Sequence, residues 1–107
     1  MGMDMRQMMR QAQKMQRELA TAQDEIKDMT YTATSGGGVV TAVARGDGRI
    51  ESLTIKPEVV DPEDVSLLED MVTAAVNEAL KGVSEQADKR LSSVTGGMNI
   101  PGMPGLM

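Results

Sequence analysis

Residues 5–29 read MRQMMRQAQKMQRELATAQDEIKDM, and their apolar side chains recur at alternating steps of three and four. The series is Met5, Met8, Ala12, Met15, Leu19, Ala22, Ile26 and Met29, which is the a/d pattern of a coiled-coil seam. The spacing predicts a helix over residues 4–29, roughly 40 Å long at the α-helical rise. Because the seam is continuous and apolar, we expect this helix to lie against another surface.

The face of this helix opposite the seam is basic. Within an arc of roughly 80° it carries the basic stripe, which consists of Arg6, Arg10, Lys14 and Arg17. The stripe has two interpretations: a row of phosphate ligands, or an ordinary solvated face supported by a Lys14–Glu18 pair one turn apart. Taken alone, the pattern favours the solvated face, since charge on the outer side of a helix is common.

Charge is distributed unevenly along the chain. The 107 residues carry 11 basic and 16 acidic side chains, for a net charge of −5. A net negative charge argues against a nucleic-acid partner. However, residues 57–80 contain seven acids and no base, whereas residues 1–20 have a local balance of +2. A polyanion is therefore expected to approach only one part of the molecule.

The composition excludes several classes of function. The chain has no cysteine and no histidine, which removes disulfides, thiolate and imidazole metal sites, and histidine-dependent catalysis. We therefore expect no enzyme activity, no metal and no cofactor. No apolar run reaches 18 residues, so neither a membrane span nor a signal peptide is predicted, and a cytoplasmic protein is expected.

The middle of the chain has the signature of a small antiparallel sheet. Residues 30–35 read as a short strand, and strands over 39–45 and 49–56 are joined by Gly46-Asp47-Gly48, whose glycines are expected to supply the positive φ of a tight hairpin. The run Gly36-Gly37-Gly38 lacks the lysine and the strand-to-helix context of a phosphate loop and is interpreted as a turn. Ile50 is out of phase with Leu53, which predicts a bulge or a strand apolar on both faces.

A second long helix is predicted over residues 61–94. Asp61 is the expected N-cap, Pro62 suits the first helical position, and Gly82 is a weak point costing about 1 kcal/mol relative to alanine. One domain is expected over residues 1–95, followed by a flexible Gly/Pro/Met tail over 96–107. Because two long helices and a hairpin do not close a globule, we expect a homodimer.

Several motifs, in fixed order, resemble the YbaB/EbfC family of small bacterial nucleoid-associated proteins. They are MMRQAQKMQ at 8–16, SGGGVV at 35–40, LEDMVTAAVNEAL at 68–80, and VTGGM at 94–98 with the PGMPG tail. The chain departs from common family residues at Thr41, Arg45 and Lys56. The resemblance implies an α+β fold with a long N-terminal helix, a short antiparallel sheet with a central hairpin and a long C-terminal helix, forming a tweezer-like homodimer.

The resemblance also implies DNA binding with low or modest sequence specificity, a role in nucleoid organisation or gene regulation, and no catalysis. The family pattern transfers no DNA-contacting residues, so the candidates come from charge alone: Arg6, Arg10, Lys14 and Arg17 of the stripe, Lys89 and Arg90 near the end of the second helix, and secondarily Arg45 and Arg49 beside the hairpin turn. The alternative is a dimeric adaptor that binds another protein through its Met-rich surfaces and tail, with DNA contact incidental.

Overall fold

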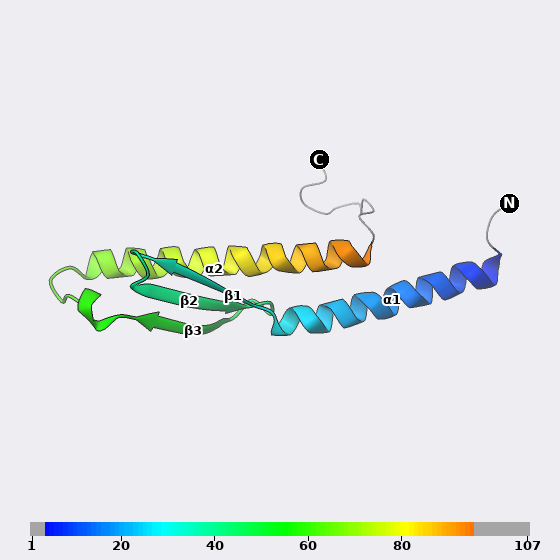
Figure 1. Ribbon diagram of the computed structural model, residues 1–107, viewed down its shortest axis with the longest axis horizontal. Helices are drawn as coiled ribbons and strands as arrows, with labels where there is room; N and C mark the ends of the chain where they lie inside the picture. The colour runs from blue at the N-terminus through cyan, green and yellow to red at the C-terminus, as the bar shows by residue number, and fades with distance from the viewer. Residues whose placement is uncertain (1–3, 96–107) are drawn as a thin grey trace, which may run out of the picture.

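The computed structural model describes residues 4–95 and has the α+β architecture expected from the sequence. Its elements in chain order are α1 (Met5–Asp28), β1 (Thr30–Ser35), β2 (Val40–Arg45), β3 (Ile50–Ile55), a 3-10 turn η1 (Pro57–Val59) and α2 (Val65–Val94). The strands form one antiparallel sheet in the order β1-β2-β3. Figure 1 shows α2 lying along this sheet, while α1 continues past the end of the sheet as a projecting arm.

The β2–β3 hairpin contains the irregularity that its sequence predicted. Val43 pairs with Ser52, but the next residue, Ala44, pairs with Ile50, so Glu51 is a bulge without an opposite partner. The bulge returns Ile50 to the face that carries Leu53, because one extra residue reverses the alternation of side chains. Of the two alternatives that the sequence left open, a bulge or a strand apolar on both faces, the structure has the bulge, which leaves Glu51 beside the hairpin end of the sheet.

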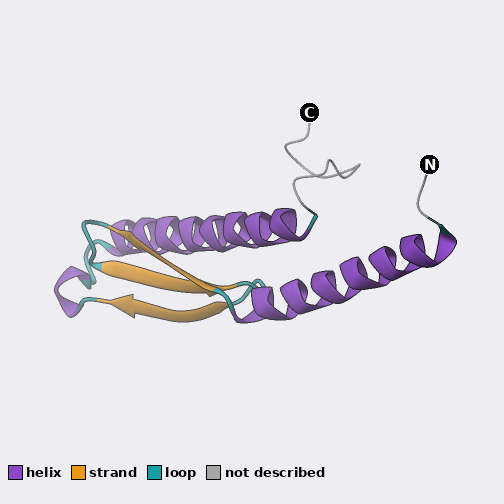
Figure 2. Cartoon of the chain, turned by 45° about the vertical axis from the view of Figure 1, so that its right-hand side comes forward, coloured by secondary structure: helices purple, strands orange, loops and turns teal. Residues whose placement is uncertain are grey.

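The core lies between one face of the sheet and α2 (Figure 2). Its buried residues are mainly alanines of β1, β2 and α2, with Val40 the largest fully buried side chain. Small side chains on both surfaces let the helix approach the strands closely. They also bury little apolar area, which limits the stability that one chain can gain from this core.

The arm formed by α1 has little of the chain beneath it. Only Ala22 and Ile26 of this helix are buried, whereas the Met5 and Met8 side chains of the seam are 78% and 55% exposed. The chain has a radius of gyration of 19.9 Å, compared with about 13 Å for a compact domain of 100 residues. Most of the apolar seam is thus uncovered in one chain.

The helix boundaries differ from the expected ones mainly at the start of α2. Asp4 caps α1, accepting a 2.8 Å hydrogen bond from the Gln7 amide. The helix expected from residue 61 begins at Val65, and its N-cap is Asp64, not Asp61. Asp61 instead accepts from the Glu63 amide at 2.9 Å and stabilises the turn before the helix. The expected tail, residues 96–107, lies outside the described residues.

The two glycines of the hairpin turn have different roles. Gly48 has a φ of +86°, as the turn requires, but Gly46 does not have a positive φ. Gly46 is needed for close packing, since a Cβ there would overlap the Ile26 carbonyl of α1. Its amide also donates a 2.8 Å hydrogen bond to the Met29 carbonyl. The prediction that both glycines supply positive φ is therefore wrong for Gly46.

Candidate nucleic-acid interface

The two helices bring three cations together around one groove. Lys14 and Arg17 of α1 and Arg90 of α2 line a cavity of about 670 Å³, together with Glu18, Thr21, Ser93 and Val94. We call this cavity the basic groove. It holds three cations against one carboxylate, and the Thr21 hydroxyl can donate a hydrogen bond to an anion, whereas the Ser93 hydroxyl donates to the Arg90 carbonyl over 2.7 Å. The fold thus brings Lys14 and Arg90, which are 76 positions apart in the chain, to one surface.

Arg90 is held in the groove by an ion pair between the helices. Its Nε donates to Glu25 Oε2 over 2.7 Å, and its Nη1 donates to Ser93 Oγ over 3.0 Å. The hydrogen bond from Arg90 lowers the pKa of Glu25 below its ordinary value and raises the pKa of Arg90. The pair fixes the end of α2 beside α1, although it also offsets part of the charge on Arg90.

The outer half of the basic stripe lies on the exposed arm. Arg6 and Arg10 line a second hollow of about 390 Å³ on α1 with Met9 and Gln13. Among the residues that the structure describes, no ion pair joins Lys14 to Glu18, and the ion pair within α1 is instead Asp24–Lys27 at 3.7 Å. The stripe cations are therefore not neutralised by a partner one turn away.

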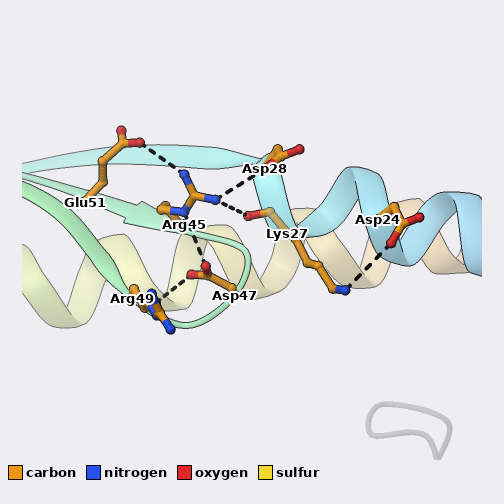
Figure 3. A network of polar contacts seen from close by, with 7 residues as sticks. All are labelled: Asp24, Lys27, Asp28, Arg45, Asp47, Arg49 and Glu51. Atoms are coloured by element: carbon orange, nitrogen blue, oxygen red, sulfur yellow. Dashed lines mark hydrogen bonds and ion pairs between the residues drawn. The ribbon is translucent and has the colours of Figure 1, made fainter.

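Arg45 is paired with carboxylates from three segments. Asp28, Asp47 and Glu51 all lie within salt-bridge distance of its guanidinium (Figure 3). The charge of Asp47 is the main reason that the pKa of Arg45 is raised. Three nearby carboxylates repel a phosphate, so this position does not suit a phosphate ligand.

The other two sequence candidates lie outside the basic groove. Arg49 is exposed beside the hairpin turn, where its amide donates a 3.2 Å hydrogen bond to Asp47 Oδ1. Lys89 is exposed on α2 but does not line the groove that holds its neighbour Arg90. The structure thus brings together Lys14, Arg17 and Arg90 and leaves Arg49 and Lys89 apart from them.

The acidic run lies around the other end of α2. Glu58, Asp61 and Asp64 line a separate cavity of about 320 Å³ together with Gly36, Val39, Val59, Leu67 and Met71. With 30 residues, α2 extends about 45 Å, so this acidic end is well separated from the groove at its C-terminal end. The uneven distribution of charge along the sequence therefore places the acidic cavity and the basic groove at opposite ends of α2.

Sequence reasoning missed the groups that surround the candidate cations. The hydroxyls of Thr21 and Ser93, and the pairing of Glu25 with Arg90, depend on the packing of α1 against α2 and leave no local sequence signal. The carboxylates around Arg45 were also missed. Two of them, Asp47 and Glu51, lie close to it in the sequence, and that proximity was the one signal present.

Within residues 4–95, neither helix combines the length and apolarity that crossing a membrane requires. The same residues contain no cluster of three or more acidic, cysteine or histidine side chains arranged to hold a metal ion.

Comparison with known proteins identifies the family of this small α+β protein. The chain belongs to the YbaB/EbfC DNA-binding family, whose model matches residues 1–98. It is 49% identical over 105 residues to a nucleoid-associated protein of Acetivibrio thermocellus, covering 98% of this chain and 91% of that protein. It is 47% identical over 102 residues to a nucleoid-associated protein of Clostridium kluyveri, covering 95% of this chain and 90% of that protein.

A solved structure also resembles this fold. The crystal structure of an uncharacterized protein from Helicobacter pylori aligns with a TM-score of 0.72 at 26% sequence identity, covering 89% of this chain and all of that chain. The family model and the two bacterial relatives confirm the family expected from the sequence motifs.

Proposed function

We propose that this protein is a nucleoid-associated protein that binds duplex DNA as a homodimer, mainly through phosphate contacts. Membership of a DNA-binding family and the naming of its relatives as nucleoid-associated proteins support this function. The observation that carries it is the basic groove, where Lys14, Arg17 and Arg90 from two helices face one cavity. The protein then acts on the bacterial nucleoid, in the cytoplasm, in nucleoid organisation or gene regulation, without catalysis.

The proposed contacts extend from the groove along the arm. They are made by Arg6, Arg10, Lys14, Arg17 and Arg90, with Lys89 and Arg49 as secondary contacts. Phosphate contacts position a protein on DNA but carry no base information. With one tyrosine and no other aromatic residue in the chain, stacking on bases is limited, so low or modest sequence specificity follows. The acidic end of α2 is repelled by DNA and turns the molecule so that the groove faces the duplex.

The homodimer part of the proposal is supported by the uncovered apolar surface. The seam residues Met5, Met8 and Met15 are among the exposed large hydrophobic side chains, and the alanine-rich core buries little area. A second chain would cover part of this surface and double the number of cations presented to DNA. The number of phosphate contacts can be read from the salt dependence of binding, because the logarithm of the binding constant falls by about 0.9 per contact for each tenfold increase in salt.

A salt titration of DNA binding tests the proposal. We compare wild type with Lys14→Gln/Arg17→Gln, and use Lys56→Gln/Lys81→Gln as a control that removes the same charge from exposed positions outside the groove. The groove variant is expected to bind duplex DNA more weakly, with a salt slope shallower by about 0.9 for each phosphate that the variant no longer binds. The control should change both quantities much less.

Two results would contradict the proposal. Equal effects of the groove and control variants would show that only net charge matters. Unchanged affinity and slope in the groove variant would leave the stripe as a solvated face and favour the adaptor function, in which the exposed methionines bind a protein partner. Sedimentation of each variant must first show the same oligomeric state as wild type.

A further inference from the structure

Arg45, the last residue of β2, connects the end of α1 to the hairpin. Its Nη2 donates to the Lys27 carbonyl over 3.2 Å and to Asp28 Oδ1 over 3.3 Å. On the hairpin side, its Nε donates to Asp47 Oδ2 over 3.4 Å and its Nη1 to Glu51 Oε1 over 3.5 Å. Figure 3 shows this guanidinium between the end of the helix and the hairpin. This one side chain therefore links the C-terminal end of α1 to the β2–β3 hairpin.

The other ties of α1 are also confined to its C-terminal turns. Ala22 and Ile26 are its buried residues, and Glu25 bonds to Arg90. The first half of the helix lies exposed on the arm (Figure 1). The direction of the whole arm is thus set over residues 22–28, by the contact with α2 and by the junction near Asp28 together.

A small change of angle at this junction moves the basic stripe a long way. Arg6 lies 22 residues before Asp28, which corresponds to about 33 Å along the helix. Tilting the arm by about 10° would move Arg6 by about 6 Å, close to the length of one helical turn. Displacements of that size take a cation out of contact with a given phosphate.

Without Arg45 the three carboxylates around it would lose the one cation that they share. Asp28 lies on the α1 side, while Asp47 and Glu51 lie on the hairpin side, and Arg45 is within 3.5 Å of all three carboxylates. Carboxylates gathered around one guanidinium repel one another when it is removed, although water weakens the repulsion at exposed side chains. Removing the guanidinium would therefore turn an attraction between the arm and the sheet into a repulsion.

We propose that Arg45 is a positioning residue: it fixes the angle between α1 and the sheet and thereby places the basic stripe on DNA without contacting phosphate itself. The placement on DNA rests on the proposed function, whereas the control of the angle does not. Arginine suits this role because its planar fork donates in several directions at once, which the single ammonium of lysine does not reproduce.

The angle can be measured directly because the chain contains no cysteine. Spin labels on Gln7→Cys in α1 and Thr54→Cys in β3, both exposed positions, report the distance between arm and sheet by pulsed electron resonance. Labelled protein is diluted into unlabelled protein so that distances within one chain are measured. We expect a narrow distribution with Arg45, and a broader or displaced distribution in Arg45→Gln. Identical distributions would overturn the proposal.

A second measurement separates positioning from direct contact. Arg45→Gln is expected to weaken binding to duplex DNA about fivefold, the usual scale for a residue that acts through others, with its salt slope unchanged. A slope shallower by about 0.9 for each arginine removed would mean that Arg45 contacts phosphate, and would overturn the proposal. If wild type fails to bind DNA, the proposed function fails, but the label distances still decide whether Arg45 sets the angle.

Two further variants distinguish a change in the angle of α1 from misfolding of the protein. Arg45→Lys keeps the positive charge and should give a distribution of intermediate width. Asp28→Asn in the Arg45→Gln background removes the carboxylate on the α1 side and should narrow the distribution again, because the repulsion across the junction is relieved. If Asp28→Asn narrows nothing while the circular dichroism of all variants matches wild type, electrostatic control of the angle is excluded.

Discussion

Arg90 on α2 donates a 2.7 Å hydrogen bond to Glu25 on α1, although the two residues are 65 positions apart. The bond joins the helices where the basic groove begins, so it links the shape of the groove to a titratable carboxylate. Its energy depends on the ionisation of Glu25, and it therefore has a defined dependence on pH.

The Glu25–Arg90 pair should stabilise the fold at neutral pH and lose this effect in acid. The pKa of Glu25 is lowered in the folded protein from its ordinary value of 4.5, so the folded state favours the carboxylate. The contribution is complete above that ordinary value and disappears as the pH falls through the lowered pKa. Urea unfolding of wild type and Glu25→Gln should differ at about pH 7 and converge in acid, below the lowered pKa of Glu25.

The same comparison carries its own control. Glu85 also lies on an exposed helix surface but makes no ion pair among those found in residues 4–95. Glu85→Gln should therefore differ little from wild type at either pH. A Glu25→Gln difference that persists undiminished in acid would show that the side chain acts by packing and not by charge.

Gly46→Ala should destabilise the protein by about 1–3 kcal/mol, the usual cost of overpacking. The added Cβ would overlap the Ile26 carbonyl, and relief of that overlap requires the hairpin to move away from α1. Gly48→Ala is the matched comparison: its φ of +86° is unfavourable for alanine, but its Cβ would meet open space. In Gly48→Ala, the strain of alanine at this positive φ should lower the free energy of unfolding by about 1–2 kcal/mol.

Thermal or chemical unfolding measures both glycine variants, and the spin-label pair separates their mechanisms. Gly46→Ala should shift the distance between arm and sheet, whereas Gly48→Ala should leave it in place. A shift of equal size in both would mean that any disturbance of the turn moves the arm.

Gly82→Ala should also destabilise the protein, although helix propensity favours alanine by about 1 kcal/mol. Gly82 is buried in α2 directly beneath the ring of Tyr31, which a Cβ would overlap. Overpacking of about 1–3 kcal/mol outweighs the propensity gain. The free energy of unfolding should recover in Gly82→Ala/Tyr31→Leu, where the smaller side chain makes room. A stabilised Gly82→Ala protein would show that the ring moves aside at no cost.

Met8→Asp/Met15→Asp should shift the proposed homodimer toward monomer. Both residues belong to the exposed seam of α1, and a carboxylate loses solvation when a second chain covers it. Sedimentation velocity at several protein concentrations measures the change. Gln7→Asp/Gln13→Asp adds the same charge away from the seam and should leave association unchanged. If both variants associate like wild type, the seam is not the dimer surface.

Much of the fold was predictable because its signals are local. The a/d spacing of residues 5–29, the hairpin glycines and the phase shift at Ile50 each indicate one element or one irregularity. The expected start of α2 is too early because Asp61-Pro62 is itself a good capping sequence, and Asp64 is an equally good cap three residues later. Local capping chemistry does not choose between two such carboxylates.

The candidate site was only partly predictable. The basic stripe follows from helical geometry, so Lys14 and Arg17 could be grouped without a structure. Whether Arg90 or Arg45 joined them could not be decided, because each has a similar sequence environment of nearby acids. In the structure Arg90 lines the groove while Arg45 is enclosed by carboxylates.

The sequence by itself determined the family, the α+β class, the basic stripe and the separation of charge between residues 1–20 and 57–80. All of these depend on residue order over short distances or on composition. Tertiary structure decided that Gly46 packs against Ile26, that Arg90 enters the groove and that Arg45 spans the junction of the arm with the sheet. The physical reason is that each of these contacts joins segments distant in the chain, and only the packing of α1 and α2 on the hairpin brings their atoms together.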